Sequence, residues 1–170
     1  MKTPQAQHVL LAGFSGAGKT TVLRELARVL PQTPSLDLDQ LVIAGHGSVA
    51  EIVKKEGWSG YRARELTQLG QVLARPDGII LALGGGTLEQ GWPAIDQSVV
   101  KVVHLDCPFE TCWQRISGGS ERPLVELGEA ALRKLFEERK PLYQRCSLRV
   151  DSTQSPVEVA LAILRLTGLA

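Results

Sequence analysis

Short segments with the pattern of strands alternate along the chain with longer segments in which apolar residues recur every three or four positions. The short segments cover residues 8–12, 35–39, 79–83, 98–105 and 147–151. Residues 79–83 are a continuous apolar run, which is typical of a central parallel strand. The longer segments predict helices at residues 21–30, 48–55, 61–74 and 108–116, a long helix around Leu132, and a closing helix from Pro156. Strand and helix alternate five times, which predicts an α/β fold with one domain over residues 1–170. We expect a five-stranded parallel sheet, helices on both faces, and ligands at the carboxyl ends of the strands.

Two local expectations come from the same pattern. Alternation in residues 35–39 places Asp37 and Asp39 on one face, at the carboxyl end of the strand. Neighbouring carboxylates repel each other unless a cation or a donor lies between them, so we favour a metal and a hydroxyl substrate. A polar strand end that caps the next helix is the alternative. Pro141 lacks a backbone N–H and predicts a kink or break just after Arg139.

Residues 13–20, GFSGAGKT, fit the phosphate-loop pattern G-x-x-x-x-G-K-[ST]. Glycines let the backbone turn its N–H groups toward an anion, Lys19 supplies a charge for the outer phosphates, and the Thr20 hydroxyl can bind Mg²⁺. A strand precedes the loop and a helix follows it, which favours a nucleotide site over a glycine-rich turn that binds nothing. The candidate nucleotide contacts are Ser15, Gly16, Ala17, Gly18, Lys19, Thr20 and Thr21.

Composition excludes several other classes of protein. A formal net charge of +1 argues against binding to nucleic acid or to an anionic membrane. No apolar run approaches the roughly 18 residues of a membrane span, and residues 1–5 lack the apolar segment of a signal peptide. The three cysteines, Cys107, Cys112 and Cys146, form no C-x-x-C pair and predict reduced thiols in a cytoplasmic protein.

Further motifs follow the phosphate loop. Arg62 and Glu65 are three positions apart on a predicted helix, either as a positioned guanidinium or as an ordinary surface ion pair. Residues 84–86 are three glycines directly after a buried strand, where a ligand approaches the backbone or a flexible connector begins. Residues from about 117 to 128 are rich in glycine and charge and are a candidate lid over the nucleotide site.

Together these motifs resemble the shikimate kinases, small members of the nucleoside monophosphate kinase-like phosphate-loop fold. The resemblance spans nearly the whole chain and rests on six elements in the family's order: residues 13–20, Asp37-x-Asp39, Tyr61-Arg62-x-x-Glu65, the glycines 84–86, Arg122-Pro123-Leu124 and Arg139-x-x-x-Tyr143. It implies ATP-dependent phosphorylation of the 3-hydroxyl of shikimate, a step of aromatic amino acid biosynthesis. It also implies Mg²⁺, the small molecules ATP and shikimate as partners, and a monomer.

The resemblance assigns a role to each matching residue. Lys19, Asp39 and Arg122 are the implied catalytic residues, and Thr20 and Asp37 the implied metal ligands. Arg115, Arg122 and Gln154 join the phosphate loop in binding ATP, with residues 152–155 as the loop that contacts adenine. The implied shikimate contacts are Asp39, Arg62, Glu65, Gly84, Gly85, Gly86 and Arg139.

The chain departs from the family pattern at three places. Ala82 stands where a serine or threonine is usual, Trp58 stands where a glutamate is usual, and the helix after Asp39 lacks its common acidic residue. Another kinase of the same fold, such as a gluconate or nucleotide kinase, is the nearest alternative. A non-catalytic, nucleotide-dependent switch protein is the second. Ala82 and Trp58 allow that switch, whereas Lys19, Asp39 and Arg139 argue against it.

Overall fold

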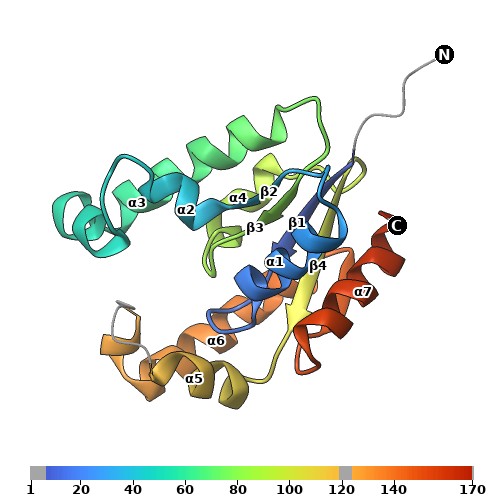
Figure 1. Ribbon diagram of the computed structural model, residues 1–170. Helices are drawn as coiled ribbons and strands as arrows, with labels where there is room; N and C mark the ends of the chain where they lie inside the picture. Colours follow the sequence, from blue (N-terminus) through green and yellow to red (C-terminus); the bar gives the residue numbers. More distant parts are fainter. Residues whose placement is uncertain (1–6, 119–123, 170) are drawn as a thin grey trace.

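The computed structural model describes residues 7–118 and 124–169, which form one parallel sheet flanked by helices (Figure 1). The strands are β1 (His8–Ala12), β2 (Ser35–Asp37), β3 (Ile80–Ala82), β4 (Val100–Asp106) and β5 (Leu148–Asp151), and their order in the sheet is β2-β3-β1-β4-β5. The helices are α1 (Lys19–Val29), α2 (Leu38–Ile43), α3 (Val49–Leu73), α4 (Leu88–Gly91), α5 (Phe109–Ser117), α6 (Glu129–Gln144) and α7 (Pro156–Thr167), with 3₁₀ turns at Trp92–Ala94 and Val125–Leu127. The predicted five-stranded parallel α/β fold is confirmed.

The central strand β1 explains the continuous apolar runs. It pairs with β3 on one side and β4 on the other, so that Leu10 lies between Leu81 and Val102. All three side chains are fully buried. Each such side chain contributes about 1.5–3 kcal/mol relative to an exposed position. Because both faces of the strand are covered, its sequence shows no polar alternation.

Helices cover the sheet in two groups. Helix α1 packs against α7, and α4 packs against α3 and α6 (Figure 1). Helix α7 begins with a capping box, in which the Ser155 hydroxyl accepts from the backbone N–H of Glu158 and Pro156 takes the first helical position. The three cysteines are all free, as the sequence predicted.

One expectation about element boundaries was wrong, a second was wrong in part, and the alternative of a polar strand end that caps the next helix is confirmed for Asp37. Strand β2 ends at Asp37, whose Oδ1 accepts from the backbone N–H of Gln40 at 3.3 Å and caps α2. Asp39 therefore lies in the first turn of α2 and not on the strand. The Asp37 carboxylate satisfies a backbone N–H group at the start of the helix, which favours a helix that begins directly after Asp37.

Helix α6 also continues through Pro141 to Gln144 without the predicted break. A proline inside a helix costs about 3 kcal/mol, and contacts beyond Pro141 hold the last turn in place. The Tyr143 ring stacks on His104 at 5.0 Å between centroids, and its hydroxyl donates to the carbonyl oxygen of Gly85 at 2.6 Å. The indole N–H of Trp92 donates to the carbonyl oxygen of Leu142 at 3.1 Å.

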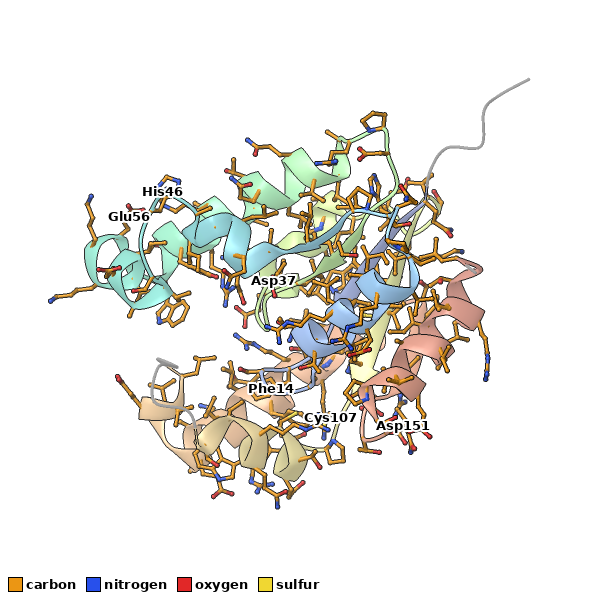
Figure 2. All side chains as sticks on the ribbon, in the orientation of Figure 1. Phe14, Asp37, His46, Glu56, Cys107 and Asp151 are labelled. Carbon is orange, nitrogen blue, oxygen red and sulfur yellow. The ribbon has the colours of Figure 1, made fainter. Side chains whose placement is uncertain are left out.

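The two helices predicted over residues 48–55 and 61–74 form one kinked element, α3. Gly57, at the kink, has φ of 73°, a left-handed conformation that a residue with a side chain rarely adopts. Helices α2 and α3 contact each other and share a small core of Val42, Ile52 and Tyr61. They form a lobe beside the sheet, with His46 and Glu56 at its outer end (Figure 2).

Candidate active site

A cavity of about 560 Å³ lies at the carboxyl ends of the strands, between the phosphate loop, the α2–α3 lobe and α6. It gathers most of the predicted site residues, from segments far apart in the sequence. These are Ser15, Gly16, Gly18, Lys19, Thr20, Thr21, Asp37, Asp39, Arg62, Gly84, Gly85, Gly86, Arg115 and Arg139. Figure 2 labels Phe14, in the phosphate loop, and Asp37, at the end of β2. Arg122 lies outside the described residues, as do residues 119–123 of the predicted lid.

The phosphate loop is shaped to receive an anion. Gly16 and Gly18 take φ of 88° and 96°, and Gly18, the residue before α1, has no side chain with which to cap the first turn of the helix. The Lys19 ammonium donates to the carbonyl oxygens of Gly13 and Phe14 at 2.8 and 3.1 Å. Burial lowers the pKa of Lys19 to about 8, against the opposing charges of Asp39 and Asp37. The loop thus holds a desolvated cation that a phosphate would stabilise.

Thr20 and Asp37 form an oxygen pair at the edge of this loop. The Thr20 hydroxyl donates to Oδ2 of Asp37 at 2.8 Å. An octahedral Mg²⁺ with bonds of about 2.0–2.1 Å holds neighbouring ligands about 2.9 Å apart, so the two oxygens are already spaced to share one ion. Within residues 7–118 and 124–169, no group of three or more His, Cys, Asp or Glu side chains could hold a metal. Two protein oxygens suit Mg²⁺, which keeps most of its ligands as water and phosphate.

Asp39 has a partner that sequence reasoning missed. The Tyr61 hydroxyl, on α3, donates to Oδ1 of Asp39 at 2.5 Å. Burial, followed by the charge of Asp39, raises the pKa of Tyr61 well above its usual range. The motif had drawn attention to Arg62 and Glu65, and no spacing in the sequence indicated a contact 22 positions back along the chain.

The Arg62–Glu65 pair is buried, which excludes the surface ion pair that we considered as an alternative. Arg62 Nη1 donates to Oε2 of Glu65 at 2.6 Å, and the Glu65 side chain is 1% exposed. The Thr87 hydroxyl donates to the other carboxyl oxygen of Glu65 at 2.5 Å. Burial raises the pKa of Glu65, and the Arg62 guanidinium opposes that rise. Glu65 therefore lies beneath the cavity and holds Arg62 in one orientation.

Arg139 is buried with one nitrogen unused. Its Nε donates to Oε1 of Glu89 at 2.6 Å, whereas Nη1 has no hydrogen-bond partner among the described residues. A methyl group at Gly86 would lie 2.6 Å from Nη2 of Arg139 and would clash with Nη2 of Arg62. The two guanidinium groups therefore meet at Gly86, and a side chain there would push them out of their present positions. The sequence analysis did not identify Glu89. Its position three residues after Gly86 is the one feature of the sequence that could have indicated a role.

Arg115 links the two ends of the predicted nucleotide site. Its Nη1 donates to the carbonyl oxygen of Gly16 at 3.1 Å and its Nη2 to that of Ser152 at 3.2 Å. Arg115 therefore joins the phosphate loop to the segment after β5. Gln154 in that segment is exposed, donates to Asp151 at 3.4 Å, and does not line the cavity. Ala17 is buried beneath the loop.

A phosphate loop between β1 and α1, a threonine–aspartate oxygen pair and two arginines across one cavity define a phosphate-loop kinase of a small molecule. The family model for shikimate kinase matches residues 15–167. The chain belongs to the shikimate kinase family.

Individual relatives agree with the family model. The shikimate kinase of Acinetobacter baylyi is 38% identical over 167 residues, which cover 93% of this chain and 90% of the relative. That of Persephonella marina is 30% identical over 164 residues, covering 93% of this chain and 97% of the relative. In the part of the chain that the structure describes, no helix is long and apolar enough to cross a membrane.

Solved structures show the same fold. Shikimate kinase from Acinetobacter baumannii, in complex with shikimate, superposes with a TM-score of 0.88 at 32% identity, covering 98% of this chain and 94% of that one. A gluconokinase from Sinorhizobium meliloti gives a TM-score of 0.66 at 19% identity, over 99% of this chain and 95% of that one. This second likeness is one of fold alone.

Proposed function

We propose that this protein transfers the γ-phosphoryl group of ATP to the 3-hydroxyl of shikimate, giving shikimate 3-phosphate and ADP in aromatic amino acid biosynthesis. The observation that carries the proposal is the meeting of Arg62 and Arg139 at Gly86, where the buried Nη1 of Arg139 has no hydrogen-bond partner among the described residues. Planar guanidinium groups match a carboxylate, and shikimate carries one. The complex of the Acinetobacter baumannii relative with shikimate supports the same assignment.

The cavity separates the tasks of the reaction. Arg62 and Arg139 bind the carboxylate of the acceptor, and Asp39 accepts a hydrogen bond from the hydroxyl that attacks. Lys19 and the N-terminus of α1 bind the phosphates of ATP. Phosphoryl transfer passes through a loose transition state, so holding donor and acceptor in line matters more than a strong base. Thr20 and Asp37 would hold Mg²⁺, which neutralises charge on the phosphates when it is bound.

The remaining assignments complete this proposal. The resemblance to the family assigns Arg122, outside the described residues, to the transferring phosphoryl group, and Arg115 and Gln154 to the adenine, although Gln154 does not line the cavity. The contact of Arg115 with both Gly16 and Ser152 supports its placement there. We propose further that the enzyme acts as a monomer in the cytoplasm.

A coupled assay of ADP release tests the function directly. Purified protein is given ATP and Mg²⁺ with shikimate, with gluconate, or with a set of nucleoside monophosphates, in parallel reactions. We expect ADP release in the reaction that contains shikimate and none in the reactions with the other acceptors. Faster ADP release with gluconate or a nucleotide would reassign the substrate, and no release with any acceptor would favour a switch protein.

Ala82 leads to a prediction about the metal. It is the residue of β3 that pairs with Asp37 of β2, so the two side chains project to the same face of the sheet. A serine hydroxyl there could hydrogen-bond to water on the metal, and such outer partners change affinity about 10- to 100-fold. Ala82→Ser should therefore lower the Mg²⁺ concentration that gives half-maximal rate, measured by Mg²⁺ titration at saturating shikimate. An equal or higher requirement would contradict the prediction.

A further inference from the structure

The Tyr61 side chain spans two parts of the molecule. Its ring belongs to the small core of the α2–α3 lobe with Val42 and Ile52, and the residue is 3% exposed. Its hydroxyl reaches out of that core to Oδ1 of Asp39 at 2.5 Å. The other carboxyl oxygen of Asp39 has no hydrogen bond to any described residue, and Asp39 lines the cavity. One oxygen is thus engaged by Tyr61, and the other is left available to a ligand in the cavity.

The ring of Tyr61 is fixed by its neighbours. Trp58 packs edge-on against it, with centroids 5.8 Å apart and an angle of 82° between the planes. The Arg62 guanidinium carbon lies 5.6 Å from the Tyr61 centroid and 5.7 Å from that of Trp58. A cation over an aromatic face is attracted to it, so the arginine and the two rings hold one another. The direction of the Tyr61 hydroxyl is therefore set by α3.

The same hydroxyl is a permanent donor. A phenol is protonated at neutral pH, and burial, with the nearby carboxylates of Asp39 and Glu65, raises the pKa of Tyr61 further. Without such a donor, the carboxylate of Asp39 could rotate about its terminal bond, because that torsion has broad minima. A short hydrogen bond to an ionised acceptor is among the stronger hydrogen bonds in proteins and can fix that rotation.

We propose that Tyr61 is a positioning residue for the reaction proposed above: its hydroxyl fixes the Asp39 carboxylate so that the free oxygen receives the attacking hydroxyl of the substrate. The inference rests on that function. Arg62 contacts the same ring. Tyr61 therefore also fixes the distance between Asp39, which binds the attacking hydroxyl, and Arg62, which binds the carboxylate of the acceptor. Its role is to hold the acceptor in line with the phosphoryl group.

Tyr61→Phe tests the proposal, since it removes the hydroxyl and keeps the ring. We expect kcat with shikimate to fall about 10-fold. The KM for shikimate should change less than about threefold because the arginines remain, and the KM for ATP should not change. Thr67→Ala is the matched control, because Thr67 lies exposed on the same helix and its hydroxyl donates to the carbonyl oxygen of Ala63, in the preceding turn of that helix. This control should retain wild-type kcat and both KM values.

A double-mutant cycle shows whether Tyr61 acts through Asp39. In the Asp39→Ala background, Tyr61→Phe should cost less than about twofold, because there is no carboxylate left to orient. An equal loss in both backgrounds would overturn the proposal, as would wild-type kcat in the single variant. If wild-type protein releases no ADP with shikimate, the function proposed above fails, and the contact between the two residues is then judged by spectroscopy.

The chain has two tyrosines, Tyr61 and Tyr143, so fluorotyrosine labelling gives two ¹⁹F resonances. A Tyr143→Phe variant assigns them even if Tyr61→Phe fails to fold. We expect Asp39→Ala to shift the Tyr61 resonance and leave that of Tyr143 in place. Thr67→Ala should shift neither. If the chemical shift of the Tyr61 resonance is the same in wild type and in Asp39→Ala, the proposal loses its basis.

Discussion

Replacing Lys19 by alanine is expected to lower kcat by about 1,000-fold or more. Lys19 is the cation of the phosphate loop, held by the carbonyl oxygens of Gly13 and Phe14 at the edge of the cavity. Losing one preorganised donor to a transition state typically costs about 100- to 1,000-fold, and a cation on a transferring phosphoryl group contributes about 1,000-fold or more. Steady-state ADP release with shikimate measures the loss. A variant that keeps more than about a tenth of wild-type turnover would contradict the assigned role.

The same variant should remain folded, which separates a chemical defect from a structural one. The pKa of Lys19 is lowered from 10.5 to about 8, so below pH 8 the charged ammonium lowers the free energy of unfolding of the wild-type chain. Removing it relieves this cost and loses two hydrogen bonds of about 1 kcal/mol each, so Tm should change little at pH 7. Relative to the variant, wild-type stability should rise between pH 8 and 10.5, as the folded protein releases that proton first. Lys134→Ala, at an 80% exposed side chain, is the control for both measurements.

Replacing Arg139 by lysine should lower kcat/KM for shikimate about 10- to 150-fold. This range corresponds to the loss of a charge-assisted hydrogen bond of about 1.5–3 kcal/mol. The guanidinium binds Glu89 through Nε while its buried Nη1 stays available, and a lysine has only one nitrogen for both partners. ATP affinity should barely change because Arg139 is not assigned to the nucleotide.

Kinetics with each substrate varied in turn decide this prediction. Arg62→Lys should show the same selective loss, because Arg62 meets Arg139 at Gly86. Arg133→Lys is a matched control on the same helix, where the side chain is 46% exposed and pairs with Glu110 and Glu129. It should alter kcat/KM by less than about twofold. An equal fall in ATP affinity, or no change in either variant, would show that the two arginines do not bind the acceptor.

The fold was largely predictable because its signals are local. The central strands β1 and β3 are short apolar runs that are buried along their whole length, and the phosphate loop is marked by eight consecutive residues. The errors arose where distant contacts outweigh a local rule. Pro141 predicted a kink or a break, and the packing of Tyr143 beyond it keeps α6 unbroken to Gln144. Asp39 looked like part of a strand until Asp37 was seen to cap α2.

The residues predicted to contact ATP or the acceptor could be identified from the sequence, whereas the residues that hold their side chains in place could not. Lys19, Arg62 and Arg139 stand in recognisable motifs, so their place at one cavity could be expected. The Glu89 carboxylate on Arg139 and the Tyr61 hydroxyl on Asp39 depend on three-dimensional contacts 50 and 22 positions apart. No periodicity or motif encodes such a contact, because any polar residue at those positions would fit the same helical pattern.

The unpaired nitrogen of Arg139 also bears on how long the protein survives in a cell. A carboxylate bound in the cavity would give this nitrogen a charge-assisted hydrogen bond. A ligand that binds only the folded chain stabilises it by mass action, by about 2.7 kcal/mol at 100 times its Kd. Quality-control proteases act on the small unfolded fraction, so substrate-saturated molecules are degraded more slowly than empty ones. The abundance of the enzyme would therefore follow the supply of its acceptor, without any dedicated regulator.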